Sequence, residues 1–472
     1  MDELATARRH DRAAILIGAL ALGAMVVYVS SGIALLAPAV VGVLSLFALT
    51  IALVPAADGA ARARIMRWTM VAFAAHLAFG LAVANLGGIV RDYLAAPDAG
   101  AYHAGAQALL QHWEGGFPAP DLPAGKEGYY YLLGALYRVF GVHPVAGLAV
   151  NATLAAALIP VVSDTTRRLF GRAPTRYVAP LVVLLPGIFL WTSQLLKEAA
   201  ILLLIAVAAN GAVRLCQRFS PAPLLAVTVA LVLLLTLRAW VALALAGALL
   251  VGIAFGARGM VTGVGLGLSV VAVFAMLVAA GGLGYSGYRA ATSSNLQQAN
   301  AVRQDLATAG SGFDPDADVS TPARALSYLP RGLVQFTFGP FPWQISGARQ
   351  LALVPDMLVI WLLLPSLWRG LRRGRPLVNR ELLVLILPAI AVAMLLSLSV
   401  GNYGTQLRER TQVLVLVVPF VALGLSERAA RRSRRAAPAD AGLPMGRYPA
   451  QHDGVGSPPV PSASPHAAHA HS

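Results

Sequence analysis

Long apolar runs recur along the whole chain and dominate its pattern. Each run is near 20 residues, which is enough for a helix to cross a hydrocarbon layer about 30 Å thick. The pattern therefore predicts about twelve membrane-spanning helices. The first half of the chain contains Ala13–Val29, Ile33–Pro55, Trp68–Leu86, Pro144–Val162, Tyr177–Trp191 and Leu195–Val213. The second half contains Ala222–Leu237, Ala239–Phe255, Met260–Ala280, Leu353–Trp368, Leu382–Val400 and Thr411–Leu425.

The composition points to the same class. Of 472 residues, 57% are apolar and only 12% are charged, which excludes a soluble protein. The net charge of +15 would suit a nucleic-acid-binding protein, but most of the basic residues lie in short loops between the apolar runs. We expect an all-α polytopic membrane protein with membrane lipid around it and no nucleic-acid partner. The single cysteine, Cys216, cannot form an intrachain disulfide.

The loops alternate in charge, which sets an orientation. With the N-terminus in the cytoplasm, every inner loop is basic and most of the acidic residues fall outside, as the positive-inside rule requires. Lysine occurs only at Lys126 and Lys197, and such an arginine-rich composition is typical of a GC-rich bacterial gene. The prediction is a multi-pass protein of the bacterial plasma membrane with both termini cytoplasmic.

Two long segments outside the membrane divide the chain. Loops longer than about 15 residues are usually functional or disordered. The predicted parts are N-terminal membrane helices (1–86), an extracytoplasmic loop with surface helices (87–143), central membrane helices (144–280), a second extracytoplasmic loop (281–352), C-terminal membrane helices (353–425) and a disordered cytoplasmic tail (426–472).

The two loops differ in character. After Asp98, Tyr102, Ala106, Leu109 and Trp113 recur at helical spacing and predict an amphipathic helix on the outer face. The run Gly128–Phe140 is apolar but short for a span, so we expect it to lie on the membrane or dip into it. In the second loop, the polar stretch Thr292–Thr321 is expected to be mobile, and LPRGLVQFTFGPFPWQ then returns to the membrane.

Asp98 is the main candidate for chemistry. A carboxylate just above the bilayer can act as a general base or bind a divalent metal ion. The alternative is a solvated helix cap, because Asp is a preferred N-cap residue. Tyr102, one turn later, is a candidate for substrate binding. His103, His112 and Glu114 lie nearby without any recognised metal-ligand spacing.

Other charged residues lie at the predicted outer ends of spans. Lys197 and Glu198 occur in WTSQLLKEAA, where they either serve a site or extend to the interface as ordinary helix-end charges. Four arginines run against the positive-inside bias. They are Arg238, Arg331, Arg408 and Arg410. The guanidinium fork suits phosphate oxygens, and the alternative is contact with lipid headgroups.

Several function classes lose support. Ion-coupled transporters usually carry ionisable groups near the midplane, and His76 is the clearest such residue here. The sequence has no Walker loop, no dinucleotide-binding glycine motif and no CxxC pair. His466, His469 and His471 fit a solvated tail better than a metal site.

Three segments resemble a known family. PDAGAYHAGAQALL, GYYYLLGALYRVFGVHPVAGLAVNATLAA and LLPGIFLWTSQLLKEAA are similar to the C-type integral-membrane glycosyltransferases, in particular their protein-mannosyltransferase-like bacterial members. The resemblance covers about residues 90–205, with weaker likeness in GPFPWQ and GNYGTQLRER. It implies that Asp98 corresponds to the family's catalytic or metal-linked acid and Glu198 to its later acid. A divalent metal ion is therefore one cofactor that the resemblance allows.

The sequence departs from the family in two ways. The family's acidic loop follows the first span, whereas here it follows the third, as an extra N-terminal hairpin would produce. The family's adjacent acidic pair is also missing, since Asp98 has no immediate acidic neighbour.

The resemblance implies transfer of a sugar from a polyprenyl-phosphate donor to a glycan, lipid or protein acceptor of the cell envelope, on the outer face. On this hypothesis Asp98 is catalytic, and Tyr102, Lys197, Glu198, Arg238, Arg331, Arg408 and Arg410 bind substrate. An O-antigen-type polymerase or ligase, or a lipid or glycan transporter, remains the alternative.

Overall fold

The computed structural model describes residues 37–54, 58–85, 95–123, 125–257, 295–308, 310–345, 347–351, 354–375 and 378–436, with a few more positions between 264 and 275. The chain contacts divide it into two units, Met1–Ala429 and Ala430–Ser472. The described helices lie in the first unit, apart from the last residues of the C-terminal helix. The predicted span Ala13–Val29 lies outside the described residues, and Met260–Ala280 lies mostly outside them.

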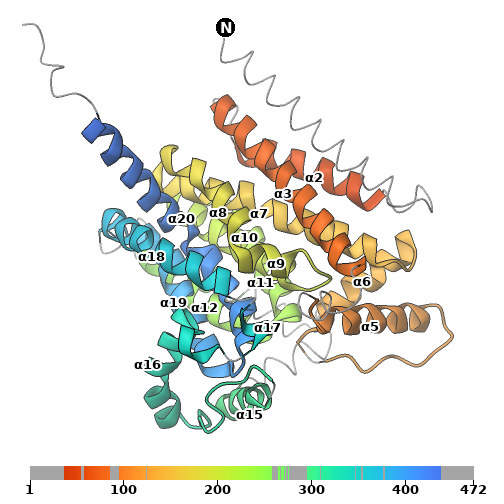
Figure 1. The fold of residues 1–472 in the computed structure, drawn as a ribbon. Coiled ribbons are helices and arrows are strands. Elements are labelled where there is room, and N and C mark those ends of the chain that lie inside the picture. The colour runs from red at the N-terminus through yellow and green to blue at the C-terminus, as the bar shows by residue number, and fades with distance from the viewer. Residues whose placement is uncertain are drawn as a thin grey trace, which may run out of the picture. The chain divides into compact units, whose positions relative to one another are not determined.

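Regular structure in the described residues is helical throughout (Figure 1). Seven of the described helices are long and apolar enough to cross a membrane, or eight if a bent pair counts as one span. The seven are α3 (Gly59–Asn85), α7 (Pro144–Phe170), α10 (Glu198–Gln217), α12 (Ala239–Gly256), α18 (Val354–Gly374), α19 (Leu383–Ser399) with the short turn before it, and α20 (Tyr403–Ala436) up to Ser433. The shorter apolar helices α2 (Ala37–Leu53) and α11 (Pro221–Leu237) also coincide with predicted spans. The described residues thus confirm a polytopic helical fold, and the total of twelve spans stays a prediction.

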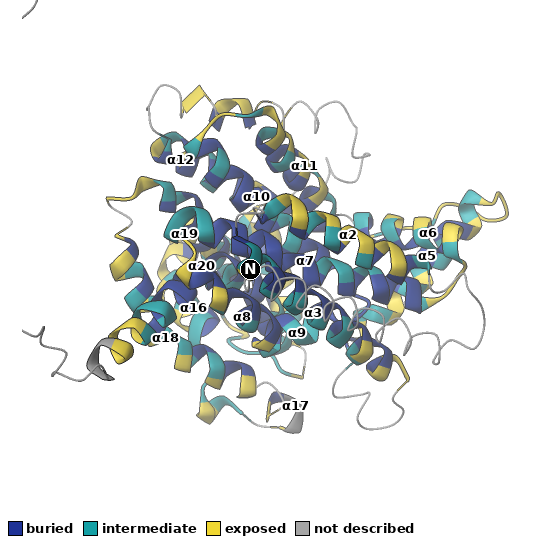
Figure 2. Ribbon diagram, turned by 90° about the horizontal axis from the view of Figure 1, so that it is seen from above, coloured by how far each residue is buried: buried dark blue, intermediate teal, exposed yellow. Residues whose placement is uncertain are grey.

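Helices α7 and α10 form the most buried part of the unit. Small residues along α7, such as Ala149, Ala152 and Ala156, are buried and allow close approach to α3, α2 and α10. Figure 2 shows most of α7 and α10 in the colour of buried residues. A helix that is apolar on all sides and buried on most of them belongs in the centre of a bundle. These two helices therefore form a rigid frame for the residues at their ends.

The predicted span Tyr177–Trp191 is a broken helix. Helix α8 (Val178–Leu184) and helix α9 (Pro186–Thr192) meet at a bend of 57°. Pro186 is the physical cause, because its ring prevents the residue before it from staying helical and it cannot donate the next helical hydrogen bond. Asp356 of α18 is buried here and accepts a hydrogen bond from the Gly187 amide at 2.7 Å, so the break is bonded to a neighbouring helix.

The first long loop contains two packed helices. Helix α5 (Asp98–Trp113) begins at the residue where the sequence predicts it, and Tyr102, Ala106 and Leu109 are buried. Helix α6 (Glu127–Phe140) packs on α5, and Gly105 and Gly134 allow the close contact, because a Cβ at either position would meet an aromatic ring of the other helix. The helix is thus found where the pattern predicts it, while its amphipathic character and its place at a membrane surface stay predictions.

The polar stretch Thr292–Thr321 was expected to be mobile, and its described part is instead built into the fold. Helix α15 (Leu296–Ala307) is followed by a turn whose residue Phe313 donates from its amide to the carbonyl of Gly401 at 2.8 Å. Arg303 is fully buried. The polar composition of the stretch does not reveal this packing, in which the Arg303 guanidinium lies over the Tyr328 ring of α16 (Pro322–Phe338) and donates to the Tyr328 hydroxyl.

The segment 426–472, which the sequence predicts to be disordered, begins as a helix, since α20 extends to Ala436. The remainder of the predicted disordered tail lies outside the described residues.

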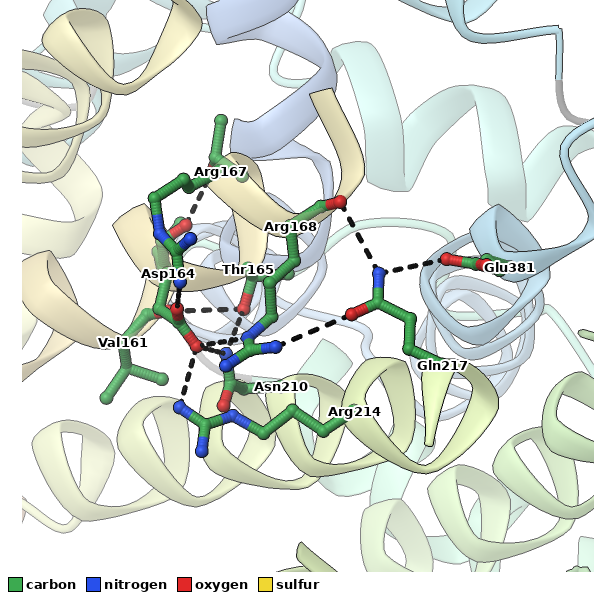
Figure 3. Close-up of polar contacts among 11 residues, drawn as sticks. Val161, Asp164, Thr165, Arg167, Arg168, Asn210, Arg214, Gln217 and Glu381 are labelled. Atoms are coloured by element: carbon green, nitrogen blue, oxygen red, sulfur yellow. Dashed lines mark hydrogen bonds and ion pairs between the residues drawn. The ribbon is translucent and has the colours of Figure 1, made fainter. Parts of the chain in front are cut away.

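A polar cluster lies where α7 and α10 end (Figure 3). The buried carboxylate of Asp164 accepts from Arg167 at 2.6 Å, Arg168 at 2.7 Å, Arg214 at 2.8 Å and Asn210 at 3.0 Å. These residues come from two helices, so the carboxylate joins the end of α7 to the end of α10. Gln217 extends the cluster to Glu381 at 3.0 Å. The bonds of the Asp164 carboxylate given above are all to side chains of α7 and α10, which is the arrangement of a structural cross-link.

Candidate functional site

A cavity of about 350 Å³ lies at the opposite end of α10 from Asp164. It is bounded by the start of α5, the residues before α6, the N-terminus of α10, the junction of α11 and α12, helix α15, the end of α19 and the first turns of α20. Its ionisable lining residues are Asp98, Lys126, Lys197, Arg238, Asp305, Arg408 and Glu409. A volume of this size suits a small polar ligand.

Asp98 faces Arg408 rather than capping its helix. Arg408 Nη1 lies 2.6 Å from Asp98 Oδ2, and the Asp98 side chain makes no cap hydrogen bond at the start of α5. Burial acts to raise the pKa of Asp98, but the charge and hydrogen bond of Arg408 outweigh it and lower the pKa below its usual value. Asp98 is therefore ionised at neutral pH, and half of its side chain (49%) is exposed to solvent.

Glu198 is the buried acid of the site. It occupies the first turn of α10, where a negative charge is favoured by the helix dipole, and only 1% of its side chain is exposed. Its Oε1 lies 3.2 Å from Arg408 Nε and 3.5 Å from Arg238 Nη2. A buried charge must be paired, and these two arginines supply the pairing. The alternative of a helix-end charge that extends to the interface does not fit this burial.

Arg238 links Glu198 to a third carboxylate. It is the residue between α11 and α12, so a single residue turns the chain and places its side chain at the helix ends. Its guanidinium forms an ion pair with Glu409 of α20 as well as with Glu198. Two arginines thus alternate with three carboxylates, in the order Asp98, Arg408, Glu198, Arg238 and Glu409.

Lys197 lines the cavity beside these ion pairs. The loop before α10 is fixed by Asn151, whose amide donates to the carbonyl of Leu196 at 2.8 Å. Lys197 Nζ donates to the carbonyl of Leu237 at 2.7 Å and so satisfies one of the unpaired carbonyls at the end of α11. Burial, together with the charge of Arg238, lowers the pKa of Lys197 well below its usual value.

Tyr102 also lines the cavity, one turn after Asp98. Its ring packs edge-on against Tyr129, with centroids 4.9 Å apart. Burial and the nearby charge of Glu198 raise the pKa of Tyr102, so its hydroxyl stays protonated.

The other two predicted arginines lie elsewhere. Arg410 is buried, and its guanidinium donates to the carbonyls of Phe336 and Gly339, which satisfies backbone groups at the end of α16. Arg331 is on α16, is 72% exposed and forms an ion pair with Asp314. Neither residue lines the cavity. The structure therefore brings together Asp98, Tyr102, Lys197, Glu198, Arg238 and Arg408, and leaves Arg331 and Arg410 out.

The carboxylates of the cavity do not form a donor set for a divalent metal ion. Asp98, Glu198 and Glu409 each face an arginine, which leaves Asp305 as a single lining carboxylate without one in the described residues. No group of three His, Cys, Asp or Glu side chains in the described parts of the chain is placed to bind a metal ion. His103 and His112 bond instead to the Tyr137 hydroxyl and the Phe117 carbonyl. As arranged here, the side chains do not fit the metal that the sequence resemblance allows.

Sequence reasoning missed several residues of the site. In the sequence, Asp305 and Glu409 are only two of many acidic residues on the predicted outer side, and Trp240 and Gln298 give no signal. They reach the cavity from α12, α15 and α20, which are far apart in the sequence. Only the pairing of helices in the fold brings them together.

The fold and the site define an all-helical membrane protein whose cavity contains alternating arginines and carboxylates. No family model matches the chain, and no curated protein matches it. Among solved structures, one match is the archaeal oligosaccharyltransferase AglB from Archaeoglobus fulgidus in complex with an inhibitory peptide and a dolichol-phosphate. The identity is 13%, the TM-score is 0.44, and the match covers 79% of this chain and 52% of that one, so this chain spans about half the length of that protein. The likeness is too distant to assign a family.

Proposed function

We propose that this protein is a glycosyltransferase that moves a sugar from a polyprenyl-phosphate donor to a cell-envelope acceptor on the outer face of the bacterial plasma membrane. The observation that carries the proposal is the ion pair of Asp98 and Arg408 in a cavity that also contains Lys197 and Arg238. An ionised carboxylate serves a hydroxyl acceptor, and a group of cations serves a phosphate leaving group. The sequence resemblance in residues 90–205 points to the same chemistry.

Asp98 is the general base in this proposal. The acceptor hydroxyl oxygen attacks the anomeric carbon of the donor sugar while its proton passes to the Asp98 carboxylate. The bond between the anomeric carbon and the phosphate oxygen breaks, and its electron pair leaves with the polyprenyl phosphate. Because half of the Asp98 side chain is exposed, an acceptor can reach it without rearrangement of the fold.

The cations stabilise the leaving phosphate. Arg238 and Arg408 are already paired with carboxylates, so they hold the acidic side chains in position as well as adding positive charge. Lys197 bonds to the Leu237 carbonyl, and an ammonium group has two further donors for phosphate oxygens. A phosphate beside Lys197 favours its protonated form. We assign no step to a metal ion, because Asp98, Glu198 and Glu409 face arginines.

The experiment is donor binding and turnover by purified protein reconstituted in liposomes. The donors are polyprenyl phosphates that carry a radiolabelled sugar. We expect saturable binding and the release of polyprenyl phosphate with transfer of the sugar to an acceptor extract from the cell envelope. A wild-type protein that binds neither glycosylated nor free polyprenyl phosphate would overturn the proposal. Movement of intact donor between leaflets, without cleavage of the sugar–phosphate bond, would favour a transporter instead.

A further inference from the structure

Helix α15 has one face in the cavity and another fixed to the protein. Gln298, Val302, Asp305 and Leu306 line the cavity, and their spacing places them on one side of the helix. Arg303 points to the other side and is fully buried. The helix is thus a wall of the cavity.

The contacts of Arg303 fix this wall in place. Its guanidinium donates to the carbonyl of Val400 and, at 2.6 Å, to the hydroxyl of Tyr328. The turn after α15 bonds to the start of α20 through the Tyr403 amide and the Ser311 carbonyl, 3.0 Å apart. Since α20 also carries Arg408 and Glu409, the wall and the charged residues belong to one connected structure.

The polar groups of the wall differ from those in the rest of the cavity. The cations Lys126, Lys197, Arg238 and Arg408 come from the residues before α6 and from α10, the α11–α12 junction and α20. The cavity face of α15 contributes an amide and a carboxylate, and no cation. A phosphate is attracted to the first group and repelled by Asp305, so the wall suits a neutral ligand that donates hydrogen bonds.

The side chains on the wall are available for such a ligand. In the described structure neither the Gln298 amide nor the Asp305 carboxylate has a hydrogen bond or ion pair to another side chain. Trp240, at the start of α12, lines the same cavity. Amide and carboxylate groups bind hydroxyls, and a flat indole packs on the C–H face of a sugar ring.

We infer that the cavity face of α15, with Gln298 and Asp305, recognises the sugar ring of the donor, while the phosphate lies at the cations. This inference rests on the proposed function and deepens it, since it names the residues that distinguish one sugar from another. Trp240 is the aromatic surface against which the ring packs. Arg303 is a positioning residue that acts through α15 and does not touch the substrate.

The test compares glycosylated donors with bare polyprenyl phosphate. The probes are polyprenyl phosphates that carry mannose, glucose, galactose or N-acetylglucosamine, and the measured quantity is the ratio of dissociation constants for bare and glycosylated lipid. We expect the wild type to prefer at least one glycosylated lipid. Gln298→Ala and Asp305→Asn should each reduce that preference by about tenfold, as loss of one hydrogen bond to the sugar predicts. Affinity for bare polyprenyl phosphate should not change in Gln298→Ala and should not fall in Asp305→Asn, which removes a negative charge that repels the phosphate.

Matched controls are present on the same loop. Gln297→Ala changes a neighbouring glutamine of α15 that does not line the cavity, and Asp316→Asn changes an exposed aspartate outside it. Both should keep the wild-type preference, and all four variants should keep the wild-type melting temperature. The inference is overturned if the wild type shows no sugar preference, if Gln298→Ala and Asp305→Asn behave like the controls, or if they weaken bare-lipid binding equally. A wild-type protein that binds neither bare nor glycosylated polyprenyl phosphate would instead overturn the proposed function.

Discussion

Arg408 Nη1 lies 2.6 Å from Asp98 Oδ2, although 310 positions of the sequence separate the two residues. Asp98 begins α5 in the first long loop, and Arg408 lies in the first turns of the last long helix. The same arginine also contacts Glu198 of α10. The Arg408 guanidinium therefore connects the first long loop to α10 and α20. It also lowers the pKa of Asp98, the proposed base.

Asp98→Asn should abolish sugar transfer and leave the protein folded. Asparagine keeps the size of the side chain but cannot accept the proton of an acceptor hydroxyl, and no helix cap is lost because Asp98 does not cap α5. The measurement is transfer by purified protein in liposomes, together with the melting temperature. Asp121→Asn, in the exposed loop between α5 and α6, is the matched control. Near-normal transfer by Asp98→Asn would refute the catalytic role.

Arg408→Gln should move the acidic limb of the pH profile to higher pH. Arg408 lowers the pKa of Asp98, so the wild-type carboxylate stays ionised further into the acid range. Without that charge, burial raises the pKa of Asp98, and the base becomes protonated at a pH where the wild type is still active. The measurement is kcat/KM against pH.

Arg331→Gln is the control for that experiment. It removes an arginine that also pairs with an aspartate, Asp314, but lies outside the cavity. Its acidic limb should coincide with that of the wild type. If Arg408→Gln and the wild type have the same acidic limb, Asp98 is not the group that titrates in the reaction.

Arg238→Lys should weaken donor binding, whereas Arg331→Lys should not. Arg238 contacts Glu198 and Glu409 together, and an ammonium group cannot reproduce this two-sided contact. The expected loss is about 2 kcal/mol, or roughly thirtyfold in the dissociation constant of the donor lipid. Equal affinities for the two variants would contradict a role of Arg238 at the phosphate.

The sequence predicts helices well and their contacts poorly. The start of α5 at Asp98 follows from the spacing of Tyr102, Ala106 and Leu109, because a helical face shows directly in the order of residues. The bond of the Gly187 amide to Asp356 and the burial of Arg303 depend on neighbours from distant parts of the chain. Periodicity carries no information about such neighbours.

The same reason explains which of the four candidate arginines reach the cavity. Arg408 and Arg410 are two residues apart on one helix and gave the same signal in the sequence. Arg408 faces Asp98 and Glu198, whereas Arg410 donates to backbone carbonyls at the end of α16. Residues two apart point in different directions from a helix, and only the packing of α16 and α18 decides which direction leads to the cavity.

Asp164→Asn should lower the stability of the fold. The substitution leaves Arg167, Arg168 and Arg214 without their charge partner at the junction of α7 and α10. Removal of one partner from a buried ion pair costs about 3–5 kcal/mol, and we expect about 3 kcal/mol because a quarter of each arginine side chain is exposed. The measurement is unfolding of the purified protein in detergent.

Asp58→Asn provides the comparison for Asp164→Asn. Asp58 is buried too, but it pairs with one arginine, Arg172, which is largely exposed. Asp58→Asn should therefore lower the free energy of unfolding much less than Asp164→Asn does. Equal losses of stability in the two variants would show that the Asp164 cluster stabilises the fold no more than a single ion pair does.

Labelling of single cysteines should place the cavity end of α10 outside the cell. Glu198 and Arg214 are separated along α10 by about 24 Å at 1.5 Å per residue, which is close to the thickness of the hydrocarbon layer. The arginines gather at the Asp164 end, and the positive-inside rule assigns that end to the cytoplasm.

In a Cys216→Ala background, Asp316→Cys should react with an impermeant maleimide in intact cells, and Arg218→Cys should react only after lysis. Both positions are exposed in the structure, so access of the reagent depends on the membrane alone. The opposite pattern would place Asp98 and Arg408 in the cytoplasm and exclude transfer on the outer face.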